Sequence, residues 1–80
     1  MTPLEQLLAL EDGARAATAA EYHKAPRRYL GLAVPQVEEL VAAWRADRDI
    51  AGRVALASEL WDSDIHEARI AAAKLLTQAR

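Results

Sequence analysis

The chain has 80 residues, no cysteine and a formal net charge of −2, with 10 Lys and Arg against 12 Asp and Glu. This length predicts one small domain over residues 1–80, and the lack of cysteine excludes a disulfide framework and a thiolate metal site. No apolar run approaches the ~20 residues that cross a bilayer, and the first residues lack the basic segment of a signal peptide. The expected class is a cytoplasmic protein with no membrane partner.

Alanine accounts for 19 residues, phenylalanine is missing, and no segment alternates with the two-residue period of a strand. Because alanine favours helices and lets them approach closely, the sequence predicts an all-α fold. The first helix starts at Thr2-Pro3-Leu4-Glu5, which matches a capping box with proline in the first turn. Asp12-Gly13 marks a break, and a second helix is predicted over residues 14–23. Pro26 ends it, since the residue before proline avoids helical dihedrals.

Two more helices are predicted in the centre of the chain. Pro35 suits the first turn of the third helix, and a polar break at Asp47-Arg48-Asp49 ends it. Its apolar positions follow the i, i+3, i+4, i+7 template and are Val37, Leu40, Val41 and Trp44. The fourth helix covers about residues 50–61. Its predicted inward side chains are Val54, Ala57, Leu60 and Trp61.

The fifth predicted helix follows the turn Asp62-Ser63-Asp64 and runs to Arg80. Ser63 is its predicted N-cap, and Asp64 and Glu67 lie in its first turn, where the helix dipole favours acids. Its apolar positions are Ile65, Ala68, Ala72, Leu75, Leu76 and Ala79. Because the pattern ends while still apolar, we expect either a missing continuation or a partner to cover that face.

The connection between the second and third helices carries the clearest functional signal. Lys24, Arg27 and Arg28 give it a local charge of +3 in an acidic chain, and two tyrosines and a histidine accompany them. Cations interleaved with aromatic side chains are typical of a surface that meets a phosphate backbone, although a solvated loop gives the same charge pattern. Arg15 precedes Tyr22 by about two turns of the same helix and would extend the patch.

Two segments resemble those of a known family. One runs from Tyr22 to Pro35, and its string Tyr29-Leu30-Gly31-Leu32-Ala33-Val34-Pro35 leads into a helix; the other is the helix–turn–helix string from Glu59 to Arg69. Together they resemble the N-terminal part of the HEAT-like DNA alkylation repair proteins, which include glycosylases that remove 3-methyladenine and 7-methylguanine. Order and spacing agree along nearly all of the chain.

The resemblance implies antiparallel helix pairs in a HEAT-like α–α superhelix, whose basic concave face holds duplex DNA with alkylated bases. It implies hydrolysis of the N-glycosidic bond of the alkylated purine, with no cofactor and no metal. The essential Asp, the Trp side chains and the Arg of the lesion site come from later helices without a counterpart here. We therefore expect a chain truncated at its C-terminus, with no catalytic residue and no activity alone. Tyr22 matches the family tyrosine near the lesion-bearing backbone, although a half-buried tyrosine at a helix end is the structural alternative.

Other residues that suggest chemistry have structural interpretations. His66-Glu67 does not complete a zinc-protease motif, because Ile70 stands where the second histidine is needed. A capping or ion-pairing role is expected for this pair, and His23 is expected to be exposed. Trp44 and Trp61 occupy apolar helical positions, so both are predicted to pack in the core.

The competing function is a non-catalytic helical interaction module. The net charge of −2 and the isoelectric point near 5.6 favour it, because domains that bind nucleic acids are usually strongly basic. Its partner would be a protein, or a second copy of the chain, that covers the apolar face of the last helix. The cations between Lys24 and Arg28 favour DNA instead.

Overall fold

A computed structural model describes residues 1–23 and 27–77. Within these residues the fold is all-helical, and the prediction of an all-α fold is confirmed. The helices are α1 (Pro3–Ala9), α2 (Gly13–His23), α3 (Val34–Ala46), α4 (Ile50–Asp62) and α5 (His66–Thr77). None of the helices in the described ranges combines the length and apolar character that a membrane crossing requires.

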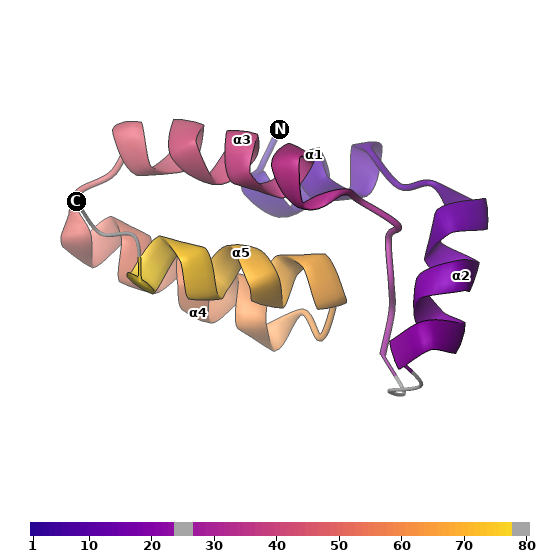
Figure 1. Cartoon of the computed structure of the whole chain (residues 1–80). Helices are drawn as coiled ribbons and strands as arrows, with labels where there is room; N and C mark the ends of the chain where they lie inside the picture. Colours follow the sequence, from indigo (N-terminus) through magenta and orange to yellow (C-terminus); the bar gives the residue numbers. More distant parts are fainter. Residues whose placement is uncertain (24–26, 78–80) are drawn as a thin grey trace.

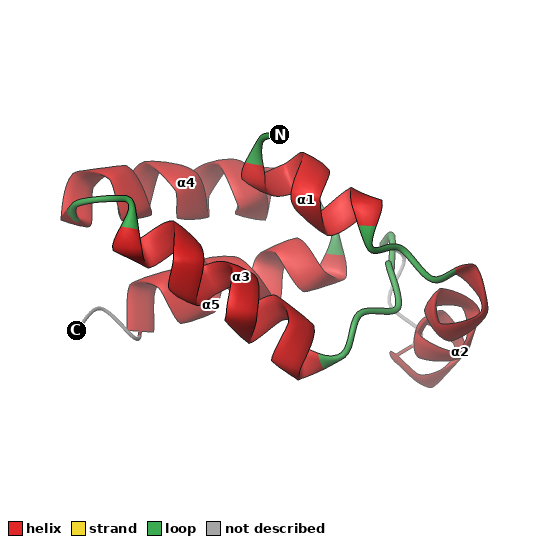
Figure 2. Cartoon of the chain, turned by 90° about the horizontal axis from the view of Figure 1, so that it is seen from above, coloured by secondary structure: helices red, strands yellow, loops and turns green. Residues whose placement is uncertain are grey.

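The helices form two layers with one helix set apart. In Figure 1, α1 and α3 lie above α4 and α5, and α2 stands at one end of the molecule. The pair α4 and α5 packs side by side, α5 also packs on α3, and α1 touches both α3 and α5. Seen from above in Figure 2, α2 remains outside the bundle of the other four helices. The position of α2 therefore depends on contacts outside the core of this bundle.

The core lies between the two layers. The largest side chains that are fully buried are Leu7, Leu30, Leu60, Leu75, Val37 and Val41. On α5 the inward face is built largely from Ala68, Ala71 and Ala72, whose small side chains let neighbouring helices approach closely. Trp44 is also buried, and its indole N–H donates to Gln6 Oε1 at 2.6 Å. This bond satisfies the polar atom of a buried aromatic ring and ties α3 to α1.

The predicted start of α1 and the break before α2 are confirmed. Thr2 Oγ1 accepts from the Glu5 amide at 3.2 Å, and Glu5 Oε1 accepts from the Thr2 amide at 2.8 Å. This reciprocal capping box satisfies amides that lack a partner at a helix start. At the start of α2, Asp12 Oδ1 accepts from the Arg15 amide at 3.1 Å. Short-range sequence signals therefore place these two helix starts correctly.

The prediction for the inward face of α4 is wrong at two positions. Ala57 and Leu60 are buried as predicted, but Val54 is 52% exposed and Trp61 is 50% exposed. Leu56 is buried instead. The reason is geometric, because α4 turns the face of Leu56 and Leu60 toward the core and leaves the stripe of Val54 and Trp61 open.

The predicted start of α5 also needs correction. The Ser63 hydroxyl donates to the Leu60 carbonyl at 2.6 Å, so Ser63 closes the end of α4 rather than capping α5. Asp64 lies in the turn with a left-handed φ of 56°, outside the helix in which it was predicted. The left-handed conformation of Asp64 ends the helical path, so that Ile65 can form its bridge before α5 begins at His66. Glu67 lies in the first turn of α5, as predicted.

Candidate nucleic-acid interface

The connection between α2 and α3, of which residues 27–33 are described, is held in place by a buried carboxylate. Glu67 is 2% exposed. Its Oε1 accepts from the Leu30 amide at 2.9 Å, and its Oε2 accepts from the amides of Gly31 at 3.0 Å and Leu32 at 3.3 Å. A buried carboxylate is costly unless its oxygens are hydrogen-bonded, and these backbone donors meet that need. The capping or ion-pairing role expected of Glu67 is therefore replaced by the binding of a distant backbone segment.

Two backbone hydrogen bonds extend this attachment on either side. The His66 amide donates to the Arg28 carbonyl at 2.9 Å, where Arg28 and Ile65 form an isolated parallel bridge. The Asp12 amide donates to the Leu30 carbonyl at 2.8 Å. The connection is thereby held between the start of α5 and the residues that precede α2.

Gly31 brings this connection into contact with α2. Its φ is +78°, which L-amino acids with a side chain rarely adopt. A Cβ built at Gly31 would lie 2.5 Å from the Ala16 nitrogen, 2.6 Å from the Asp12 oxygen and 2.8 Å from the Arg15 Cβ. Both the backbone angle and the lack of space therefore require glycine at this position.

The close approach leaves an open hollow between α2 and the connection. It has a volume of about 380 Å³. Its lining residues are Ala14, Arg15, Thr18, Ala19, Tyr22, Gly31 and Leu32. The Tyr22 side chain is 83% exposed, so it is not the half-buried tyrosine of the structural alternative. Tyr22 and Arg15, which the sequence analysis placed on one face of the helix, line the same hollow.

The two arginines of the predicted basic patch each meet a carboxylate. Arg28 Nη2 lies 2.9 Å from Glu11 Oε1. Arg27 Nε lies 4.0 Å from Asp64 Oδ1, within ion-pairing distance but beyond a hydrogen bond. The third predicted cation, Lys24, lies outside the described residues. The local charge of +3 is therefore partly offset by acids that are distant in the sequence.

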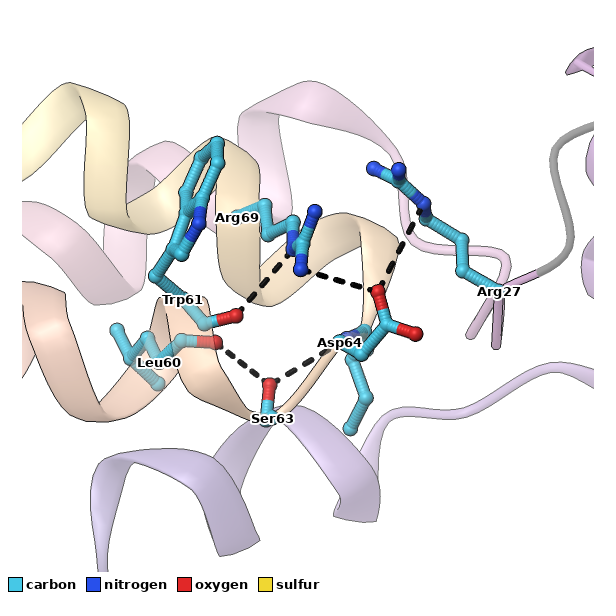
Figure 3. A network of polar contacts seen from close by, with 7 residues as sticks. Arg27, Leu60, Trp61, Ser63, Asp64 and Arg69 are labelled. Atoms are coloured by element: carbon cyan, nitrogen blue, oxygen red, sulfur yellow. Dashed lines mark hydrogen bonds and ion pairs between the residues drawn. The ribbon is translucent and has the colours of Figure 1, made fainter.

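Asp64 also joins this patch to the α4–α5 turn. Figure 3 shows its carboxylate between the guanidinium groups of Arg27 and Arg69, with Arg69 Nη2 at 3.1 Å. Arg69 also donates from Nε to the Trp61 carbonyl at 3.2 Å, and its guanidinium carbon lies 4.6 Å from the centre of the Trp61 ring. Trp61 thus has an exposed ring covered on one side by a cation, rather than the predicted core position.

A cluster of four rings joins the end of α2 to the start of α5. His23 stacks on Tyr29, with ring centroids 5.6 Å apart and planes within 8°. The His66 ring lies 4.6 Å from that of His23 and 4.8 Å from that of Tyr29, and Tyr22 meets His23 edge-on at 5.2 Å. His23 is exposed as expected, yet it supplies a side-chain contact between α2 and the rest of the molecule.

This cluster predicts a loss of stability in mild acid. Burial lowers the pKa of His66 below its ordinary value of 6.5, Glu67 opposes this shift, and His23 and Arg27 add to it. The unfolded chain therefore binds the proton more readily, so the stability present above pH 6.5 begins to be lost near that value and continues to fall until the pH is below the lower pKa of the folded state. Urea unfolding at about pH 7.5 and about pH 5.5 should show this loss, and His66→Gln should reduce it. An equal loss in the variant would contradict the role of His66.

Sequence reasoning missed the acidic partners of the connection. Glu67 was expected only to cap or to form an ion pair in the first turn of its helix, and Glu11 was not predicted to pair with Arg28. Their partners lie 36 and 17 positions away along the chain. The two segments that carry the family resemblance, however, are the two that meet here. The segment from Tyr22 to Pro35 supplies the amides, and the segment ending at Arg69 supplies the carboxylate.

Comparison with known protein families supports the resemblance that these segments carry. The family described as DNA alkylation repair enzyme matches residues 4–80. The chain belongs to this family. No curated protein and no solved structure gives a match.

The family assignment supports a role in DNA repair and fits DNA as a partner. In this DNA alkylation repair chain, the family match includes both the connection between α2 and α3 and the helix α5, whose Glu67 holds that connection. Among residues 1–23 and 27–77, no three His, Asp or Glu side chains gather into a metal-binding group. The polar groups in the lining of the hollow are the Arg15 guanidinium, the Tyr22 phenol, the Thr18 hydroxyl and backbone atoms.

Proposed function

We propose that this chain binds duplex DNA containing alkylated bases, as the N-terminal portion of a HEAT-like DNA alkylation repair protein. In the complete protein the proposed reaction is hydrolysis of the N-glycosidic bond of an alkylated purine. The single observation that carries the proposal is the hollow beside Gly31, where Tyr22 and Arg15 project from α2. Family membership supports it independently.

The hollow suits a sugar–phosphate backbone for electrostatic and steric reasons. Arg15 supplies a cation that can offer a planar fork of donors to phosphate oxygens. Tyr22 supplies an exposed ring and hydroxyl, and most of the remaining lining is small or apolar. Among the described residues no carboxylate is part of this lining, and the Asp12 carboxylate beside it accepts a hydrogen bond from the Arg15 amide.

The same lining favours binding over hydrolysis by this chain. Cleavage of a glycosidic bond develops positive charge on the sugar, which a carboxylate must stabilise. The lining of the hollow offers none. The proposal therefore assigns DNA binding to this chain and hydrolysis to the complete protein.

Duplex binding measured against salt concentration tests the proposal. Arg15→Ala should weaken binding and reduce the slope of log K against log[salt] by about one unit, because one phosphate contact is lost. The combined replacement of Lys24, Arg27 and Arg28 by Ala should reduce the slope further. Lys74→Ala, on α5 away from the hollow, is the matched control and should leave the slope unchanged.

Tyr22→Ala distinguishes binding at the hollow from general electrostatic attraction to DNA. It removes no cation, so it should weaken binding while leaving the salt slope unchanged. No binding of the wild type at low salt would overturn the proposal. Equal slopes for the wild type, Arg15→Ala and the triple variant would also overturn it.

The ion pair between Arg28 and Glu11 predicts a gain-of-binding variant. Glu11→Gln removes the carboxylate that lies 2.9 Å from Arg28, leaving that guanidinium available to phosphate. We expect affinity for duplex DNA to rise by up to about fivefold at low salt, the range of an exposed ion pair. Glu38 is exposed on α3, and Glu38→Gln makes the same change in net charge. This control should raise the affinity for DNA less than Glu11→Gln does. Equal gains in both variants would show a general charge effect only.

The alternative function is a non-catalytic interaction module that binds a protein or a second copy of the chain. One observation favours it: several large apolar side chains of α4 and α5 are exposed along one stripe. Their exposed fractions are 70% for Ile50, 52% for Val54, 50% for Trp61 and 52% for Leu76.

A further inference from the structure

An open apolar groove runs along α4 and α5. Its larger part has a volume of about 480 Å³. The residues lining that part are Val54, Ala57, Ser58, Trp61, Asp62, Ala72, Ala73, Leu76 and Thr77. A smaller hollow of about 60 Å³ shares Val54 and Leu76 with it and continues the groove toward Ile50 and Arg53. The groove therefore follows much of the length of α4.

The spacing of the groove residues favours a helix as the occupant. On α4, Ile50, Val54, Ala57 and Trp61 follow one another at intervals of four, three and four residues. This is the repeat with which a helix presents a continuous apolar seam to another helix. A groove between two antiparallel helices accepts further helices by the same packing of ridges into grooves.

The two ends of the groove carry opposite charges. Asp62 lines the end near Trp61. Arg53 lines the end near Ile50, and its guanidinium also donates to the carbonyls of Arg45 and Arg48. Nine residues of helix separate Asp62 from Arg53, or about 13 Å at 1.5 Å per residue. Two identical grooves that face each other in antiparallel directions place each Asp62 opposite the Arg53 of the other copy. Parallel grooves place like charges together, so the charges select the antiparallel arrangement.

We propose that the α4–α5 groove is an isologous interface that binds the same groove of a second copy. The two-fold axis of this dimer is perpendicular to the grooves. The α4 and α5 helices of both copies then enclose the apolar side chains that are exposed in the single chain. The proposal deepens the interaction-module alternative and rests on it. It does not depend on DNA binding at the hollow beside α2, a helix that stands at the end of the molecule away from the C-terminal end of α5 (Figure 1).

Sedimentation equilibrium of the full chain, from about 10 µM to about 1 mM, tests the proposal. We expect a reversible rise from the 8.8 kDa chain to twice that mass. Leu76→Glu places a charge in the groove of each copy and should raise the dissociation constant at least about tenfold. Val34→Glu changes a side chain of similar exposure, 49% against 52%, outside the groove and should leave the constant unchanged.

A second variant tests the charge pairing without touching the apolar seam. Asp62→Lys brings two cations together at each end of the antiparallel dimer and should weaken it several-fold, with the effect reduced by salt. If far-UV circular dichroism shows that Leu76→Glu has lost helix, Asp62→Lys decides the outcome. A chain that stays monomeric throughout, or a dimer that Asp62→Lys leaves intact, overturns the proposal. Duplex binding by folded Leu76→Glu should equal that of the wild type, so failure of one proposal is distinguishable from failure of the other.

Discussion

Glu67→Gln should destabilise the chain by about 2–3 kcal/mol, because an amide cannot replace both oxygens of the buried carboxylate. Leu30 donates to one oxygen, and Gly31 and Leu32 donate to the other. Whichever way the glutamine amide is turned, its NH₂ group faces at least one backbone N–H. A chain of this length is stable by only about 4–12 kcal/mol, so urea unfolding should show a large decrease in the midpoint.

Glu38→Gln is the control for this experiment. Glu38 is exposed on α3, so the same chemical change should alter the free energy of unfolding by less than about 0.5 kcal/mol. If Glu67→Gln proved as stable as the wild type, the amides of the connection would have to find other acceptors, and the fixing role of the carboxylate would be wrong.

Gly31→Ala should be the most damaging small substitution in the chain. Alanine disfavours the positive φ, and its Cβ would overlap backbone atoms at the start of α2. We expect a loss of about 2–4 kcal/mol in the free energy of unfolding, measured in urea. Affinity for duplex DNA should also fall, because moving α2 away from the connection opens the hollow that Tyr22 and Arg15 line.

Gly13→Ala provides the matched control. A Cβ at Gly13 meets no heavy atom within 4 Å, so this variant should be as stable as the wild type or slightly more stable. A similar loss of stability in both variants would mean that helix-start effects, rather than the contact at Gly31, explain the result.

Local signals in the sequence predicted much of the fold. The capping box at Thr2 and Glu5, the break at Asp12 and the helical apolar repeat of α3 each depend on residues within about two turns of one another. Such local signals act within one helix and do not depend on which other helix packs against it. They were therefore sufficient for the starts of α1 and α2, but not for the start of α5. They also failed for the inward face of α4, where Trp61 proved half-exposed.

The site was harder to predict because its geometry comes from distant partners. Tyr22 and Arg15 share a helix, so their common face followed from helical periodicity. The ion pair of Arg28 with Glu11 and the three amides on Glu67 join residues that only tertiary packing brings together. An acidic residue in the first turn of a helix also has a sufficient local explanation in the helix dipole, which concealed the long-range role of Glu67.

The attachment of the connection to α5 has a consequence for the order of folding. Leu30 and Gly31 are joined to Glu67 across 37 and 36 positions of the chain. On the ribosome α2 and the connection are therefore synthesised well before the carboxylate that fixes them, and closing so long a loop carries an entropic cost. We therefore expect α2 and the connection to reach their place against the bundle only after α5 has been synthesised.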